Sequence, residues 1–175
     1  MMIKDQNETK EAWFEKILFS YEKGIFRYIY TLVGQRQDAE DLTQETFVRV
    51  YKNFGSVNPQ KNLKGWLYRI ATNITYDWFR RKKIRPELFI IDDPDRPFET
   101  IDEECSYNKI ETNKDVQDAL AKIKVIYRSV LLLFYWEGLK YEEIALVLGL
   151  PVNTLKTNIM RAKQELKKVL EGNIK

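Results

Sequence analysis

Residues 141–168 constrain the fold of this chain more than any other stretch, because they carry two apolar stripes on either side of a glycine turn. The first stripe repeats at i, i+3, i+4 and i+7, which places its side chains on one face of a helix. Its members are Tyr141, Ile144, Ala145 and Leu148. The second stripe has the same helical spacing and consists of Leu155, Ile159, Ala162 and Leu166. Between them, Gly149 suits a helix C-terminus and Pro151 suits a helix start.

Two short helices joined by a tight turn are typical of a helix-turn-helix, whose second helix can enter the DNA major groove. The outer face of the second helix is amide, hydroxyl and basic. Its candidate groove-facing residues are Asn153, Lys156, Thr157, Asn158 and Arg161. Asn and Arg can read base edges there, and Lys can contact phosphate. An ordinary helical hairpin with a solvated face has the same pattern, so the rest of the chain has to decide between the two interpretations.

The composition indicates a folded protein in a reducing compartment. Apolar residues make up 44% of the 175 residues, and four Trp, ten Tyr and nine Phe provide bulk for one core or two small ones. The single cysteine, Cys105, cannot form an intramolecular disulfide. The N-terminus is charged without an apolar core, and no apolar run is long enough to span a bilayer. We therefore expect a cytoplasmic protein without direct membrane insertion.

The residue types that are missing argue against an enzyme. The chain has no histidine, which removes the commonest general base and most zinc sites, since one cysteine cannot complete a site alone. Its seven glycines are scattered and form no phosphate-binding loop. We predict no catalytic residue, no metal site and no cofactor.

The N-terminal half has a helical period in three stretches. Residues 12–33 predict two core-facing helices or one broken near Gly24, and residues 36–53 predict a helix that Asp38 or a neighbour can cap. The outward stripe of this second stretch includes Asp41, Gln44, Glu45 and Arg49. A solvated surface is the default interpretation of such a stripe.

The third stretch, residues 63–83, interleaves aromatic and basic side chains. Its buried stripe is predicted to be Leu63, Leu67, Ile70 and Ile74. Outside that stripe lie Trp66, Tyr68, Tyr76, Trp78, Phe79 and the basic run from Arg80 to Lys83. Aromatics next to cations can stack unpaired bases and hold the backbone between them, although at least one tryptophan is expected in the core.

The remaining chain divides into a linker and a second helical set. Residues 85–114 contain prolines and an excess of Asp and Glu, and are predicted to form a flexible acidic linker. The next apolar stripe continues in phase through Val116, Leu120, Ile123 and Ile126. We predict an all-α protein of two small helical domains, residues 1–84 and 115–175, with the helix-turn-helix last among four helices of the second.

Three stretches in this order resemble a bacterial sigma factor of the extracytoplasmic-function (ECF) group, the minimal two-domain kind. DAEDLTQETFVRVY, at 38–51, is similar to region 2.2 of that family. WLYRIATNITYDWFRRKK, at 66–83, is similar to regions 2.3 and 2.4, and residues 115–168 are similar to region 4. The order of the three, with an acidic linker between, makes the resemblance specific.

The resemblance implies a subunit that binds the beta-prime and beta subunits of core RNA polymerase. It also implies binding to promoter DNA, both duplex and single-stranded. The residues implied to dock on the beta-prime coiled coil are Asp41, Gln44, Glu45 and Arg49. Those implied to capture the non-template strand of the minus-ten element are Asn73, Tyr76, Trp78, Arg80, Arg81 and Lys82. The groove-facing residues of the helix-turn-helix would read the minus-thirty-five element. An anti-sigma factor is a further implied partner.

This chain departs from the family pattern at several positions. Asn153 replaces a common Gly, Pro151 a common Ser cap, and Asn158 a common Arg. Proline is tolerated at a helix start, so the fold is expected to survive, whereas no promoter sequence is predicted. Asp77 and Arg80 match an Asp–Arg pair of the family that can be structural in this chain.

Two other classes of protein stay open from the residues alone. A free-standing helix-turn-helix regulator would need a dimerisation or ligand-sensing domain, and duplex reading does not require stacking aromatics. A nucleic-acid enzyme would need histidines, metal-ligand clusters or a phosphate loop, which this sequence lacks.

Overall fold

The computed structural model describes residues 9–53, 55, 62–85 and 114–172, and all regular secondary structure within them is helical. The N-terminal set comprises α1 (Lys10–Val33), α2 (Arg36–Lys52) and α3 (Leu63–Arg81). The C-terminal set comprises α4 (Lys114–Ala121), α5 (Val125–Leu131), the π-helical turn η1 (Leu132–Trp136), α6 (Tyr141–Leu148) and α7 (Val152–Gly172). The predicted all-α class is confirmed. The predicted linker lies almost entirely outside the described residues.

The first stretch forms one continuous helix, so the predicted break near Gly24 is wrong. Thr9 caps α1 by accepting a hydrogen bond from the Ala12 N–H at 3.2 Å, and Gly34 ends it with φ 83°. Gly24 serves packing instead, because a Cβ there would lie 2.9 Å from the Tyr68 hydroxyl oxygen of α3. The glycine lets two helices approach closely without interrupting the first.

The other two N-terminal helices each bury one apolar face, and α3 also buries Tyr68 and Phe79, which the sequence placed outside its buried stripe. In α2, the buried side chains include Ala39, Leu42, Phe47 and Val50. Gln35 is the N-cap residue but makes no side-chain cap hydrogen bond, and Asp38 lies in the first turn instead of capping the helix. In α3, the carboxamide oxygen of Asn62 accepts from the Gly65 N–H at 2.9 Å and caps the helix. Leu63, Leu67 and Ile74 are buried, and Ile70 is half-buried.

The predicted continuous stripe across residues 116–126 is interrupted in the structure. The chain leaves the helical path after Ala121 and starts again at Val125, so Ile123 lies in the connection and is still buried. An apolar side chain in a turn can fall by chance at the spacing expected of a helix. The apolar spacing alone therefore did not reveal the interruption between α4 and α5. The helix-turn-helix is confirmed, with Gly149 in the left-handed region at φ 64° between α6 and α7.

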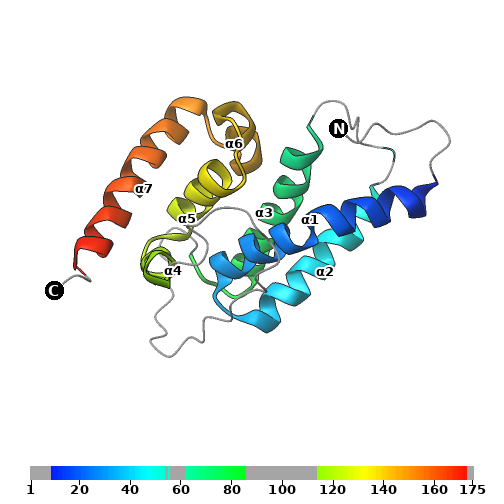
Figure 1. Ribbon diagram of the computed structural model, residues 1–175, viewed down its shortest axis with the longest axis horizontal. Coiled ribbons are helices and arrows are strands. Elements are labelled where there is room, and N and C mark those ends of the chain that lie inside the picture. The colour runs from blue at the N-terminus through cyan, green and yellow to red at the C-terminus, as the bar shows by residue number, and fades with distance from the viewer. Residues whose placement is uncertain (1–8, 54, 56–61, 86–113, 173–175) are drawn as a thin grey trace.

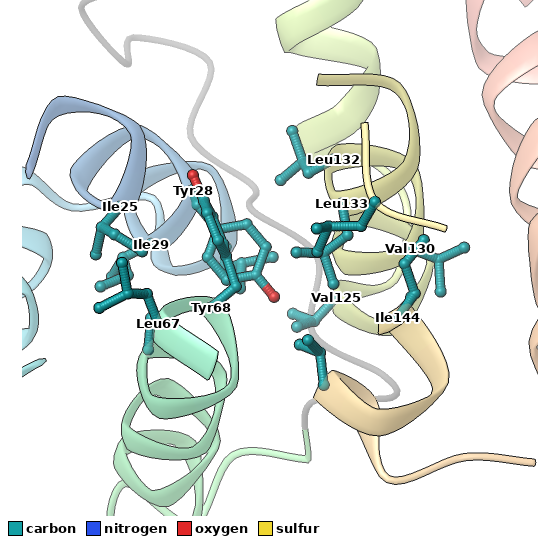
Figure 2. Close-up of a cluster of buried hydrophobic side chains, with 14 of the residues drawn as sticks. Ile25, Tyr28, Ile29, Leu67, Tyr68, Val125, Val130, Leu132, Leu133 and Ile144 are labelled. Carbon is teal, nitrogen blue, oxygen red and sulfur yellow. The ribbon is translucent and has the colours of Figure 1, made fainter. Parts of the chain in front are cut away.

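The two sets of helices pack against each other and share one apolar core. In Figure 1, α5 lies between α7, at one edge of the molecule, and the bundle of α1, α2 and α3. Figure 2 shows Ile25, Tyr28 and Tyr68 of the N-terminal set facing Val125 and Leu133 of the C-terminal set. α3 also packs on α6, and α1 on α4 and α5. The sequence left the arrangement of the two predicted domains open, and in this structure the two sets of helices are in contact.

Candidate nucleic-acid interface

The outer face of α7 presents polar and basic side chains to solvent. Leu155, Ile159 and Ala162 are buried and hold the helix against α5 and α6. Opposite them, Asn153, Lys156, Thr157 and Arg161 are exposed and Asn158 is half-buried. The Thr157 hydroxyl donates to the Asn153 carbonyl oxygen at 3.2 Å, so the hydroxyl oxygen can still accept a hydrogen bond. Four of the five groove-facing candidates thus lie on the exposed side of α7, and Asn158 lies at the margin of that side.

A contact that sequence reasoning missed connects α7 to the π-helical turn. Lys163 Nζ lies 5.4 Å from the ring centroid of Tyr135. A hydrogen bond to the Tyr135 hydroxyl raises the pKa of Lys163 above its ordinary value. Tyr135 is exposed, so this cation contact lies at the surface and supports the orientation of α7 near its middle.

The C-terminal half of α3 carries the aromatic and basic side chains predicted to bind single-stranded DNA. Trp78 is half-buried, meets Phe79 edge-on at 5.0 Å between ring centroids, and has Lys82 Nζ 5.6 Å from its ring. Arg80 forms an ion pair with Asp77, as expected for that pair. Asn73, Arg80, Arg81 and Lys82 are exposed. A partly exposed indole beside several cations can stack a base and hold the adjacent phosphates.

Tyr76 is placed differently from the other candidates on α3. It is half-buried, and its hydroxyl oxygen lies 3.2 Å from the Ser129 hydroxyl oxygen of α5. The side chain therefore faces the C-terminal helices in this arrangement. Its polar partner is 53 residues away in sequence, which no local pattern could have indicated.

The outward stripe of α2 is partly paired with itself and with α3. Arg49 Nη2 lies 3.2 Å from Glu45 Oε1, and Arg81 Nη2 of α3 lies 3.8 Å from the other oxygen of the same carboxylate. Gln37 Nε2 donates to Asp41 Oδ1 at 3.3 Å. Asp41, Gln44 and Arg49 are exposed, and such surface pairs contribute only about 0–1 kcal/mol each. These charges remain available to a partner.

Metal-ligand clusters and membrane-spanning helices are both absent from the described part of the chain. No group of three or more His, Cys, Asp or Glu side chains within residues 9–53, 62–85 and 114–172 is arranged to hold a metal ion. None of the helices in the same part of the chain combines the length and the apolar character needed to cross a membrane.

Family models match both sets of helices. Sigma-70 region 2 matches residues 18–84, and Sigma-70 region 4 matches residues 113–166. The chain therefore has the two segments that define the sigma-70 class. It is 37% identical to the ECF RNA polymerase sigma factor SigE of Mycolicibacterium smegmatis over 91% of this chain and 62% of that protein. It is 31% identical to the ECF RNA polymerase sigma factor SigW of Bacillus subtilis over 96% of this chain and 94% of that protein. The chain belongs to the ECF RNA polymerase sigma factors.

Solved structures agree with the fold. The sigma factor RpoE, solved in complex with the anti-sigma factor NepR from Bartonella quintana, has a TM-score of 0.70 with 23% identity, covering 93% of this chain and 98% of that one. CnrH, solved in complex with the cytosolic domain of CnrY, has a TM-score of 0.66 with 21% identity, covering 94% of this chain and 90% of that one. At these identities the likeness establishes the helical fold.

Proposed function

We propose that this chain is an alternative sigma factor that binds core RNA polymerase and directs transcription initiation at specific promoters, without chemistry of its own. The observation that carries the proposal is the presence, in one chain, of an exposed polar recognition face on α7 and an aromatic and basic face on α3. Each lies in the segment that matches the corresponding sigma-70 region. A cytoplasmic location follows from the proposal, because polymerase and promoter DNA are found there.

The minus-thirty-five element is assigned to α7. A helix that presents amide, hydroxyl and guanidinium groups together can read base edges in the major groove, with lysine on phosphate. The exposure of Asn153, Lys156, Thr157 and Arg161 supports this role. Asn158 is half-buried, so we assign it a contact at the margin of the interface.

The minus-ten element is assigned to the second half of α3. Melting a promoter requires that unpaired bases of the non-template strand be held, which aromatic stacking and nearby cations provide. Trp78 is the stacking candidate because part of its ring is exposed. Lys82 lies next to its ring, and Arg80 and Arg81 are exposed in the same last turn of α3, so the three cations would hold phosphates. Asn73 lies exposed on the same helix.

Core polymerase is assigned to the outward stripe of α2. Exposed charges at the rim of an interface set registry and association rate more than affinity. Asp41 and Arg49 fit that description, and Gln44 adds an exposed carboxamide. Glu45 lies within ion-pair distance of both Arg49 and Arg81 of α3. The solved relatives RpoE and CnrH are complexed with NepR and CnrY, and we include an anti-sigma factor among the proposed partners.

A run-off transcription assay tests the function directly. Core polymerase is assayed with and without the chain on a pooled library of bacterial promoters. Specific new transcripts that depend on the chain are expected, and aligning their promoters gives the recognised elements. Footprinting by the chain alone, with no effect on core polymerase, would favour a free-standing helix-turn-helix regulator instead.

A further inference from the structure

The turn that ends α3 has a lysine at a position where the backbone favours glycine. Lys83 has φ 57°, in the left-handed region that side chains rarely adopt. Its N–H donates to the Arg80 carbonyl oxygen at 3.0 Å, and the Ile84 N–H donates to the Phe79 carbonyl oxygen at 2.9 Å. These two hydrogen bonds form a Schellman motif, a common helix end whose left-handed residue is usually glycine.

The backbone of this turn is held on both sides. The two hydrogen bonds tie it to the last turn of α3, and the half-buried side chain of Ile84 packs against the apolar core. An apolar residue directly after the left-handed position commonly anchors a Schellman motif. Glycine would fit the same backbone without the steric conflict that a Cβ causes in the left-handed region. The lysine at position 83 therefore makes this turn less stable than glycine would.

The side chain of Lys83 also differs from those of the three cations that precede it. Each of those three has a partner, and the pairs are Arg80–Asp77, Arg81–Glu45 and Lys82–Trp78. Lys83 is exposed, and its ammonium group has no ion-pair, hydrogen-bond or aromatic partner in the part of the chain that the structure describes. The other three would have to exchange a partner for a new ligand, whereas Lys83 would give up none.

The helix dipole does not explain the lysine. A cation near a helix C-terminus stabilises the last carbonyl groups, but at an exposed position the effect is small and screened by salt. Arg80 and Arg81 already lie in the last turn of α3. A further positive charge at the same end adds repulsion between like charges. The strained backbone and the unpaired charge of Lys83 therefore have no structural benefit to offset them.

A fixed backbone with an unpaired cation suits the binding of phosphate. The ammonium group of lysine is a compact charge with three hydrogen-bond donors. Because the turn is already rigid, binding a phosphate has to order only the lysine side chain, which lowers the entropic cost of binding. The aromatic and basic end of α3 directly precedes this turn, with Trp78 partly exposed and Lys82 Nζ 5.6 Å from its ring centroid.

We propose that Lys83 is a further phosphate-binding residue of α3, and that the chain accepts the strained turn because it presents this cation to the backbone of single-stranded DNA. The proposal rests on the proposed function, because it takes the end of α3 as the face that holds the non-template strand. Lys83 would hold a phosphate next to a base stacked on Trp78. It follows that replacing Lys83 with glycine stabilises the protein and weakens its binding to DNA.

The test separates the charge of the lysine from the strain of its backbone. Lys83→Gln removes the charge and keeps a Cβ in the left-handed region. Lys83→Gly removes both, and Lys83→Arg keeps both. Lys23→Gln is the matched control, because Lys23 is an exposed lysine of α1 and the substitution changes the net charge by the same amount.

The binding of DNA is measured by fluorescence anisotropy with full-length protein and a labelled single-stranded oligonucleotide of mixed sequence, which is suitable because phosphate contacts carry no sequence information. At about 0.1 M salt, Lys83→Gln and Lys83→Gly should bind roughly fivefold more weakly than Lys23→Gln. The slope of log K against log salt concentration should become shallower by about 0.7, as expected for the loss of one phosphate contact on a single strand. Lys83→Arg should bind as tightly as the wild type.

Urea denaturation followed by circular dichroism measures the strain in the same proteins. The midpoint of Lys83→Gly should rise by about 0.5 M, and that of Lys83→Gln should not rise, because glutamine keeps the Cβ. The variant that binds DNA less tightly should thus be the more stable one. A purely structural role for Lys83 would not produce that combination.

Three results would overturn the proposal. The first is a wild type that does not bind the oligonucleotide at about 0.05 M salt. The second is a Lys83→Gln variant that binds as tightly as Lys23→Gln, which would mean that the lysine holds no phosphate. The third is a lower urea midpoint for Lys83→Gly, which would mean that the lysine stabilises the end of α3. Failure of the proposed function would appear differently, as absent transcription with core polymerase while binding to the single strand still depends on Lys83.

Discussion

Replacing Arg128 with methionine should destabilise the protein strongly, although methionine suits an apolar site. The substitution keeps much of the side-chain volume and removes both hydrogen bonds to the carbonyls of Thr31 and Leu32. A buried acceptor left without a donor costs about 1–3 kcal/mol, and two are affected. Part of this cost is offset because the variant no longer has to bury a charged guanidinium, which costs desolvation free energy. We therefore expect a net loss of about 2–4 kcal/mol in the free energy of unfolding.

Urea denaturation followed by circular dichroism measures this loss. With a slope of about 2 kcal/mol per molar urea for a chain of this size, the midpoint should fall by about 1–2 M. Arg128→Lys keeps the charge but has a less suitable donor geometry, so its urea midpoint should lie between those of the wild type and Arg128→Met. Lys168→Met, which removes a cation from an exposed position of α7, should change stability by less than about 0.5 kcal/mol.

An unchanged or raised midpoint for Arg128→Met would refute this reasoning. It would mean that the carbonyls at the end of α1 find water or another donor, and that apolar packing replaces the guanidinium without loss. A fall in midpoint with a second transition would instead indicate that the two domains unfold separately once the link is removed.

Three further outcomes follow from the structure. Arg161→Ala should weaken binding to the cognate promoter by about 1–3 kcal/mol and leave core affinity unchanged, measured by titration on promoters with and without the upstream element. Reversing the charges of Asp41 and Glu45 together should abolish co-purification with core polymerase without lowering helicity; full retention would exclude α2 as the docking surface. Gly24→Ala should lower the melting temperature although alanine favours helices by about 1 kcal/mol, because its Cβ would press on the buried Tyr68 hydroxyl; a higher melting temperature would contradict the close approach.

The local signals in the sequence predicted the helix-turn-helix well. Apolar spacing, Gly149 and Pro151 all act within a few residues, and α6 ends and α7 begins where those signals place them. α7 continues to Gly172, beyond the predicted stretch. The outer face of α7 followed for the same reason, since a helix with one buried stripe presents the remaining side chains to solvent. The roles of those side chains on DNA stay predictions.

Long-range packing explains what the sequence did not reveal. Glycine propensity favours a break in the middle of α1, but the approach of Tyr68 makes glycine the residue that fits there. Arg128 lies in an apolar run, and its partners are 96 and 97 residues away, so no periodicity could identify it as buried. The contact of Tyr76 with Ser129 depends in the same way on how the two sets of helices meet.

The π-helical turn η1 determines how the chain that follows it is rotated about the helix axis relative to the buried face of α5. Its Glu137 N–H reaches back five residues to the Leu132 carbonyl at 3.0 Å, so this turn holds one residue more than an α-helical turn would. Removing that residue would rotate the following chain by about 100° relative to α5. Glu137 would then leave its ion-pair partner Lys64 of α3, and Tyr135 would leave Lys163. One extra residue thus aligns the recognition helix and the interdomain contact at the same time, and a single deletion there would misalign both.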